Sequence, residues 1–286
     1  MLKDLNSNKK YVDLHIHSKC SDGTKTAQEL VEDAGQKKLK AIAITDHDCT
    51  DAVSQAIELG ETLGVEIIPG VELSSEIGDV DIHILGYLMD INHPALVTKL
   101  TEMKKVRYTR AQKIVENLNK QGIDLRFETV MSFAGHGAVG RPHIAAALLK
   151  EELVYSFREA FDRYIGYGSV AYVEKMSLKP REVFELIRNA GGVPVLAHPG
   201  VTKVDDRIAE FINDGLMGIE VFHSEHNNEA EKKYLQICRK NDLAFTGGSD
   251  FHDGTQNRAS IGSPRVPYSA VESLKAKRDA MLQGKG

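Results

Sequence analysis

The chain has 286 residues, of which 42% are hydrophobic and 27% charged, a balance that is typical of a folded globular protein and excludes a disordered or collagen-like chain. Its formal net charge of -5 at pH 7 disfavours duplex DNA as a partner, because an extended polyanion needs a basic surface. The sequence has no apolar run of about 18 residues, so we expect no membrane span. Three cysteines and an opening segment without a secretory signal favour the reducing cytoplasm.

Short β-branched runs alternate with segments of helical periodicity along the chain. The expected strands are 11–18, 39–45, 65–68 leading to Glu72, 80–87, 193–197, 218–222 and 244–247. Helices are expected after Thr26, which forms a capping box with Glu29, after Pro180, and over 51–63 and 227–240. Strands that alternate with helices favour parallel pairing, and about seven such units predict an α/β barrel.

Residues 93–176 break this alternation and are mostly helical in pattern. The helices expected there are 96–121, 142–150 and 157–165. We interpret this stretch as an insertion that covers the C-terminal face of the barrel and caps a substrate site. The barrel then consists of residues 1–92 and 177–286.

Histidines and carboxylates recur near the ends of the predicted strands, which is where a parallel barrel carries its chemistry. Six strands supply nine candidate metal ligands: His15, His17, Asp22, His47, Glu72, His83, His198, Asp250 and His252. One divalent cation takes about four to six ligands, so nine groups predict two or three ions. Mixed imidazole and carboxylate ligands suit manganese, with iron or zinc as alternatives, and the lack of thiolate pairs argues against a structural zinc.

Other polar residues lie beside these ligands in the sequence. We expect Asp13 and Asp46 to orient the ligand imidazoles by hydrogen bonds. Cys20 and Cys49 are expected to pack rather than to bind metal, because the set of histidines and carboxylates is already complete.

Through these segments the chain resembles the PHP (polymerase and histidinol phosphatase) family. The resemblance is carried by YVDLHIHSKCSDG, AIAITDHD, IIPGVELSS, DIHILGY, VLAHPG and GGSDFH. It implies a distorted (β/α)7 barrel and a trinuclear metal site. It also implies three ligand sets: His15, His17, Glu72 and Asp250; Glu72, His83 and His198; and Asp22, His47 and His252. Many members of the family have a histidine where this chain has Asp22, which leaves the third ion the least defined.

The insertion resembles that of a subgroup which acts on nucleoside phosphates, including 3',5'-nucleoside bisphosphates and AMP. Arg107 and Arg110 lie three residues apart on one helical face, and Arg141 and His143 lie in a Gly-Arg-Pro-His turn. Arginine forks match pairs of phosphate oxygens, so we predict that these four residues bind substrate, together with His223. A solvated surface for Arg107 and Arg110, and a surface turn for His223, stay open as alternatives.

We therefore predict hydrolysis of a nucleotide phosphomonoester by a metal-bridging hydroxide. The predicted catalytic residues are Asp22 and Arg141. Asp22 would act as a metal ligand, and Arg141 would stabilise the charge that develops on the phosphate oxygens. A nucleoside 3',5'-bisphosphate or AMP is the expected small-molecule substrate, and the 5' end of a short RNA would use the same chemistry.

Three alternatives remain. Histidinol phosphate is the second candidate substrate, but its single phosphate and cationic amine fit an arginine-bearing insertion poorly. Amidohydrolases, which cleave C–N bonds, also begin with His-x-His, but they often bridge their metals with a carboxylated lysine, and here the bridging candidate is Glu72. A PHP module that binds metal without catalysis tends to lose ligands, whereas this set is complete.

Overall fold

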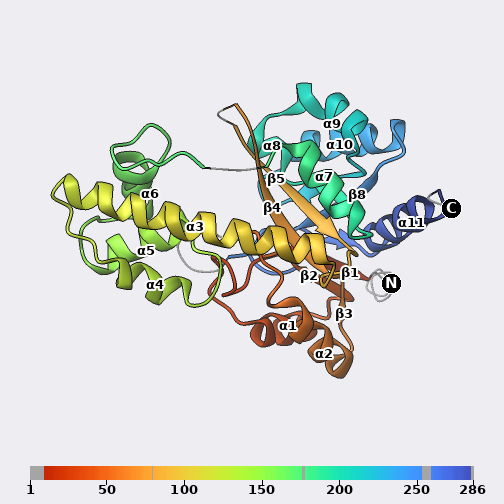
Figure 1. Cartoon of the computed structure of the whole chain (residues 1–286). Helices are drawn as coiled ribbons and strands as arrows, with labels where there is room; N and C mark the ends of the chain where they lie inside the picture. Colours follow the sequence, from red (N-terminus) through yellow and green to blue (C-terminus); the bar gives the residue numbers. More distant parts are fainter. Residues whose placement is uncertain (1–9, 79, 176–177, 253–258, 285–286) are drawn as a thin grey trace.

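The computed structural model describes residues 10–78, 80–175, 178–252 and 259–284, and its strands form two sheets (Figure 1). The first sheet has the order β3-β2-β1-β9 and consists of β1 (Tyr11–Ile16), β2 (Ala41–Ile44), β3 (Glu66–Ile67) and β9 (Val266–Pro267). The second has the order β4-β5-β6-β7-β8 and consists of β4 (Gly70–Ile77), β5 (Val80–Tyr87), β6 (Val193–Leu196), β7 (Gly218–His223) and β8 (Ala244–Gly248).

Two isolated β-bridges connect the first sheet to the second, one at each edge of the second sheet. Ile16 at the end of β1 pairs with Phe251 just after β8, and His47 just after β2 pairs with Glu72 in β4. The strands therefore surround one space as a distorted barrel, and the predicted α/β fold is confirmed. Since each ligand-bearing strand borders this space, side chains far apart in the sequence can meet inside it.

The expected parallel pairing is wrong for β5 and its two neighbours, and also for β9, which pairs antiparallel with β1. β4 pairs antiparallel with β5, and β5 pairs antiparallel with β6, whereas β1–β2, β6–β7 and β7–β8 are parallel. No helix separates β4 from β5 in the chain. Because parallel strands need a long crossover connection, β4 and β5 can pair only as antiparallel neighbours. As a result Glu72 and His83 lie within strands and not at the ends of parallel ones.

Helices cover the outside of the barrel. They are α1 (Ala27–Gln36), α2 (Val53–Leu63), α7 (Pro180–Asn189), α8 (Pro199–Thr202), η2 (Asp205–Arg207), α9 (Ile208–Asp214), α10 (Asn228–Lys240) and α11 (Ser269–Gln283). The capping box predicted at the start of α1 is confirmed: the Thr26 hydroxyl accepts from the Glu29 amide, and the Glu29 carboxylate accepts from the Thr26 amide. No helix in the described ranges is both long and apolar enough to cross a bilayer.

The strand β1 shows how the barrel separates apolar from polar side chains. Val12, Leu14 and Ile16 point to one face and are fully buried in apolar clusters. Asp13 and His15, on the other face, are also fully buried. Buried polar groups of this kind need partners, so the polar face must meet a hydrogen-bonded network or a cation.

Residues 94–165 form a helical group with an apolar core of its own. Its members are α3 (Pro94–Lys120), α4 (Phe127–Ala134), α5 (Arg141–Lys150), α6 (Phe157–Ala160) and the π-helical turn η1 (Phe161–Ile165). Figure 1 shows α3 running from the barrel to the other helices of this group, on the side opposite to α11. Ile114, Val130 and Leu148 are buried in their shared cluster. The division of the chain at residues 92/93 stays a prediction, and the predicted boundary at 176/177 lies outside the described residues.

Candidate metal centre

Glu72 lies at the middle of a group of imidazoles. Its side chain is almost fully buried, and it projects from β4 into the barrel. Five imidazole nitrogens lie between 2.9 and 3.3 Å from its carboxylate oxygens: those of His15, His17, His47, His83 and His198. A single carboxylate thus faces residues from β1, β2, β5 and β6 or the loops that follow them.

Two further carboxylates complete the group. Asp250 Oδ1 lies 3.3 Å from His15 Nε2 and 3.2 Å from His17 Nε2. Asp22 Oδ1 lies 3.3 Å from His252 Nε2, and Asp22 Oδ2 lies 3.8 Å from His47 Nε2. All nine candidate ligands predicted from the sequence therefore converge, and we call them the metal centre.

The potential ligand atoms form three sets, and within each set all the atoms lie within 4.8 Å of one another. They are His15, His17, Glu72 and Asp250; His47, Glu72 and His83; and His17, Asp22, His47 and His252. The first set equals one of the predicted ligand sets. The second has His47 in place of His198, although His198 Nε2 lies 3.2 Å from Glu72 Oε1, and the third adds His17. The partition of ligands between ions stays a prediction.

The chemistry of the donor atoms fits divalent cations. Six buried atoms of the centre make no hydrogen bond of ordinary geometry among the described residues: His15 Nε2, His17 Nε2, Asp22 Oδ1, His47 Nδ1, Glu72 Oε2 and His198 Nδ1. A buried polar atom left without a partner costs about 1–3 kcal/mol, so native proteins rarely leave several at one point. Lone pairs that converge in this way are what a bound cation would satisfy.

Backbone strain accompanies two of the ligands. His198, just after β6, has a φ of 28°, and Asp250, just after β8, has a φ of 53°. Residues other than glycine rarely adopt positive φ, and such conformations cost on the order of 1–3 kcal/mol. The fold holds both residues in these conformations at the place where their side chains enter the metal centre.

Burial and mutual charge set the protonation of the centre. Burial raises the pKa of Glu72, but the imidazoles around it, His47 first, hold the pKa well below the ordinary value. For His17 burial lowers the pKa, yet close contacts with the carboxylates of Asp250 and Glu72 raise it to about 10. Burial lowers the pKa of His47 to about 3. The carboxylates are therefore ionised, and protons on imidazoles such as His17 compete with metal ions for the same nitrogens.

A cavity of about 310 Å³ opens from the metal centre towards the helical group. His47, His83 and His198 line its inner side. Four cationic side chains line its other side: Arg107, Arg110, Arg141 and Lys175. We call this space the cationic cavity. Lys175 was not predicted from the sequence, because a single lysine in an irregular segment carries no pattern.

Two carboxylates hold three of these cations in place. Arg107 donates through Nε to Asp48 Oδ2 at 2.7 Å and through Nη2 to Ser74 Oγ at 3.0 Å. Asp81 accepts from both Arg141 at 3.2 Å and Lys175 at 3.1 Å. These ion pairs fix the direction of the cations and leave the cavity positively charged, which suits a phosphate.

Comparison with known proteins places the chain in a family. A family model described as the PHP domain matches residues 13–245. The chain belongs to the PHP domain family. The predicted class, a metal-dependent hydrolase of phosphate esters, is confirmed with it.

Several PHP relatives are similar over most of their length. The chain is 33% identical over 247 residues to the 5'-3' exoribonuclease Rnm of Escherichia coli, with 84% of each chain covered. It is 30% identical over 257 residues to the 3',5'-nucleoside bisphosphate phosphatase of Chromobacterium violaceum, with 88% of this chain and 90% of the relative covered. A solved structure from Bifidobacterium adolescentis, assigned as a metal-dependent phosphoesterase, superposes with a TM-score of 0.86 at 30% identity and covers 94% of this chain and 96% of that chain.

Glu220 contacts two residues of the metal centre, and the sequence analysis missed it. It lies in β7, is fully buried, and its Oε1 lies 2.9 Å from His15 Nδ1. Its Oε2 accepts from the His198 amide at 2.8 Å. A lone acidic residue between Ile219 and Val221 in an apolar strand was the available signal.

The predicted orienting roles of Asp13 and Asp46 need correction. Asp13 contacts no imidazole among the described residues, because its carboxylate accepts from the backbone amides of Ser249 and Gly262. Asp46 accepts from the hydroxyls of Ser18 and Ser21. Ser21 Oγ lies 3.4 Å from His17 Nδ1, so Asp46 acts on the His17 ring only through a serine.

The two remaining predicted substrate residues, His143 and His223, are not part of the lining of the cationic cavity. His143 Nε2 lies 2.8 Å from the Ser21 carbonyl, and its Nδ1 accepts from the Gly140 amide at 2.9 Å. With both ring nitrogens used inside the protein, a substrate contact would require one of these bonds to break. His223 Nε2 lies 3.5 Å from Asp250 Oδ2, beside the metal centre. For both histidines substrate binding stays a prediction.

Proposed function

We propose that this PHP protein is a nucleotide phosphatase that uses two or three divalent cations, with manganese preferred and iron or zinc as alternatives. A nucleoside 3',5'-bisphosphate or AMP is the proposed substrate, and the phosphorylated 5' end of a short RNA is the second candidate. The observation that carries the proposal is the juxtaposition of the metal centre with the cationic cavity. Together they offer ligands for cations on one side of a phosphate and arginines on the other.

The chain's own residues divide the work. His15, His17, Glu72 and Asp250, with the other ligands of the metal centre, would hold the cations. Such cations, when bound, supply Lewis acidity and lower the pKa of coordinated water. Glu72 lies between the ligand sets and is therefore the proposed bridging residue.

The arginines would bind the phosphate from the opposite side. Arg110 donates through Nε to the carbonyl of Val173 at 2.8 Å, so no carboxylate in that contact offsets its charge. Burial, and then the neighbouring cation Arg141, lower the pKa of Arg110, and a bound phosphate would relieve both effects. Arg141 and Arg107 are already directed by Asp81 and Asp48, which reduces the entropy lost when substrate binds.

The named activities of the relatives support a nucleotide substrate, since one acts on a 3',5'-nucleoside bisphosphate and another is an exoribonuclease. The chain covers at least 84% of each. A reducing, cytoplasmic compartment is part of the proposal, and it agrees with the three unpaired cysteines Cys20, Cys49 and Cys238. Histidinol phosphate stays the alternative substrate, and metal binding without catalysis the alternative role.

The decisive experiment removes metal with a chelator, restores manganese, and measures phosphate release in parallel. The substrates are AMP, adenosine 3',5'-bisphosphate, a short RNA with a 5'-phosphate, and histidinol phosphate. Release from the nucleotides or the RNA supports the proposal. Release from histidinol phosphate alone, or from none of the four with metal bound, contradicts it.

A pair of histidine variants identifies the site. His15→Ala removes a proposed ligand. Loss of a residue that only orients a ligand costs about 10- to 100-fold in activity, so we expect turnover in His15→Ala to fall by at least this factor. His136→Ala removes an exposed histidine outside the metal centre and serves as the matched control.

A further inference from the structure

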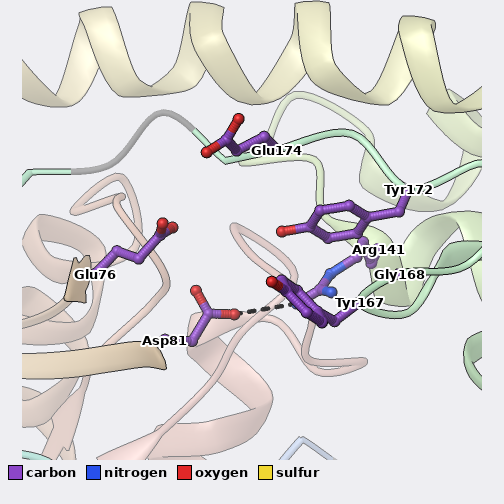
Figure 2. Close-up of a pocket in the computed structure, with 7 residues that line it drawn as sticks. All are labelled: Glu76, Asp81, Arg141, Tyr167, Gly168, Tyr172 and Glu174. Atoms are coloured by element: carbon purple, nitrogen blue, oxygen red, sulfur yellow. Dashed lines mark hydrogen bonds and ion pairs between the residues drawn. The ribbon is translucent and has the colours of Figure 1, made fainter. Parts of the chain in front are cut away.

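A second pocket, of about 510 Å³, adjoins the cationic cavity at Arg141, and Figure 2 shows the residues that line it. Its lining consists of Glu76, Asp81, Arg141, Tyr167, Gly168, Tyr172 and Glu174. We call it the tyrosine pocket. Asp81 and Arg141 also line the cationic cavity, so the two spaces share this ion pair as a common wall.

The β4–β5 pair places the tyrosine pocket on the same face as the metal centre. Glu72, Ser74 and Glu76 alternate along β4 and therefore point to one face. Ser74 pairs with His83, and Glu76 pairs with Asp81. With a rise of about 3.3 Å per residue, Glu76 lies about 13 Å along the strand from Glu72. A ligand whose phosphate lies at the metal centre can extend along this face, past Arg141, into the pocket.

Two tyrosines give the pocket an aromatic surface. The rings of Tyr167 and Tyr172 have centroids 5.3 Å apart and planes inclined by 65°. Figure 2 shows both beside the Arg141 side chain, with the three carboxylates across the pocket. Tyr167 keeps 64% of its surface exposed. Because the planes are inclined, a flat ligand cannot lie between the rings, but it can stack on one of them.

The charges in the pocket disfavour a second phosphate. Three carboxylates line it, from Glu76, Asp81 and Glu174. The one cationic side chain in its lining, Arg141, is already paired with Asp81 at 3.2 Å. Ionised carboxylates only accept hydrogen bonds, so they favour a ligand that carries N–H donors, and the tyrosine rings favour a flat one.

We infer that the tyrosine pocket binds the base of the substrate nucleotide and prefers bases with an exocyclic amino group. This inference rests on the proposed nucleotide phosphatase. An adenine stacked on a tyrosine presents its amino group to Glu76 or Glu174. Hypoxanthine has the same shape but presents a carbonyl there, which a carboxylate repels.

The inference is tested by ligand binding without turnover. Adenosine and inosine carry no phosphate, and isothermal titration calorimetry on the manganese-loaded chain measures the affinity of each. We expect adenosine to bind about five-fold or more tightly than inosine. Tyr167→Ala should weaken adenosine binding by about five-fold or more, since stacking of a base contributes about 1–3 kcal/mol. Tyr155→Ala removes a tyrosine that is 95% exposed and outside the pocket, and should change nothing.

A second variant tests the carboxylates. Glu174→Gln, at an exposed position, should reduce the preference for adenosine over inosine. Equal binding of the two nucleosides by the unaltered chain, or unchanged adenosine binding in Tyr167→Ala, would overturn the inference. So would binding of histidinol in place of adenosine, which would assign the carboxylates to an organic ammonium group.

The phosphatase assay separates this inference from the proposed function. A chain that binds adenosine through Tyr167 but releases no phosphate from nucleotides contradicts only the proposed function. A chain that releases phosphate from AMP with the same kcat/KM in Tyr167→Ala contradicts only the assignment of the pocket.

Discussion

Glu220 in β7 holds the imidazole of His15 in β1 by a contact of 2.9 Å between Oε1 and Nδ1, although 205 residues separate the two in the chain. The other oxygen of Glu220 accepts from the amide of His198. One carboxylate therefore sets the ring orientation of one ligand and the backbone position of another. Because Nδ1 of His15 faces Glu220, Nε2 is the nitrogen that faces Glu72 and Asp250.

Replacing this carboxylate should weaken the metal centre without removing a ligand. We expect Glu220→Gln to lower the affinity for manganese about 10- to 100-fold, because the outer partner no longer fixes the charge and the tautomer of His15. Titration of the metal-free chain measures this. Glu229→Gln, on the exposed start of α10, is the matched control. An unchanged affinity in a folded Glu220→Gln chain would rule out the positioning role.

Loss of an arginine from the cationic cavity should affect phosphate substrates. We expect Arg141→Ala to lower kcat/KM about ten-fold or more, the cost of one charged contact. Steady-state kinetics with the best nucleotide measure the effect. Arg158→Ala removes an arginine paired only at the surface and should leave kcat/KM unchanged. If Arg141→Ala and Arg158→Ala had the same kcat/KM, Arg141 would not contact the phosphate of the substrate.

The pH dependence should have opposite signs with and without metal. The pKa of His17 is raised from 6.5 to about 10 in the folded metal-free chain. Its contribution to stability is therefore fully present below pH 6.5 and is lost as the pH rises towards 10. Metal binding needs the neutral imidazole, so it strengthens over the same range.

We therefore expect the metal-free chain to become less stable as the pH rises from about 6.5 to about 8.5, while the increase in Tm on adding manganese becomes larger. Thermal unfolding with chelator and with manganese, at a series of pH values, measures both. An increase in Tm that is the same at every pH would mean that metal displaces no proton from the centre.

The apolar cluster of the helical group should contribute to stability separately from the metal centre. Leu148 is fully buried there, and Leu148→Ala should cost about 2–5 kcal/mol in the free energy of unfolding. If residues 93–176 form an insertion with its own core, this core is independent of the metal centre, and the manganese affinity of Leu148→Ala should equal that of the unaltered chain. Denaturant unfolding and metal titration measure the two quantities. Leu282→Ala, at a position 45% exposed, is the control. A matching loss of metal affinity would contradict the predicted division.

The sequence predicted a helix or strand well where neighbouring residues in the chain determine where that element begins. The capping box at Thr26 depends on residues three apart, and α1 begins where it predicts. Helix α4 was missed because the eight residues from Phe127 to Ala134 are mostly apolar and carry few turn signals. The antiparallel pairing of β5 was missed because hydrophobic alternation shows that a strand exists but not which neighbour it pairs with.

The residue types of the metal centre could be recognised from the chain alone, since imidazoles and carboxylates at strand positions have few other purposes when they recur so often. Which nitrogen of His15 faces the cations, how Asp81 joins Arg141 to Lys175, and where a base could stack depend on the tertiary structure. Hydrogen bonds and ion pairs act over about 3 Å, and only the folded barrel brings atoms from distant segments within that range.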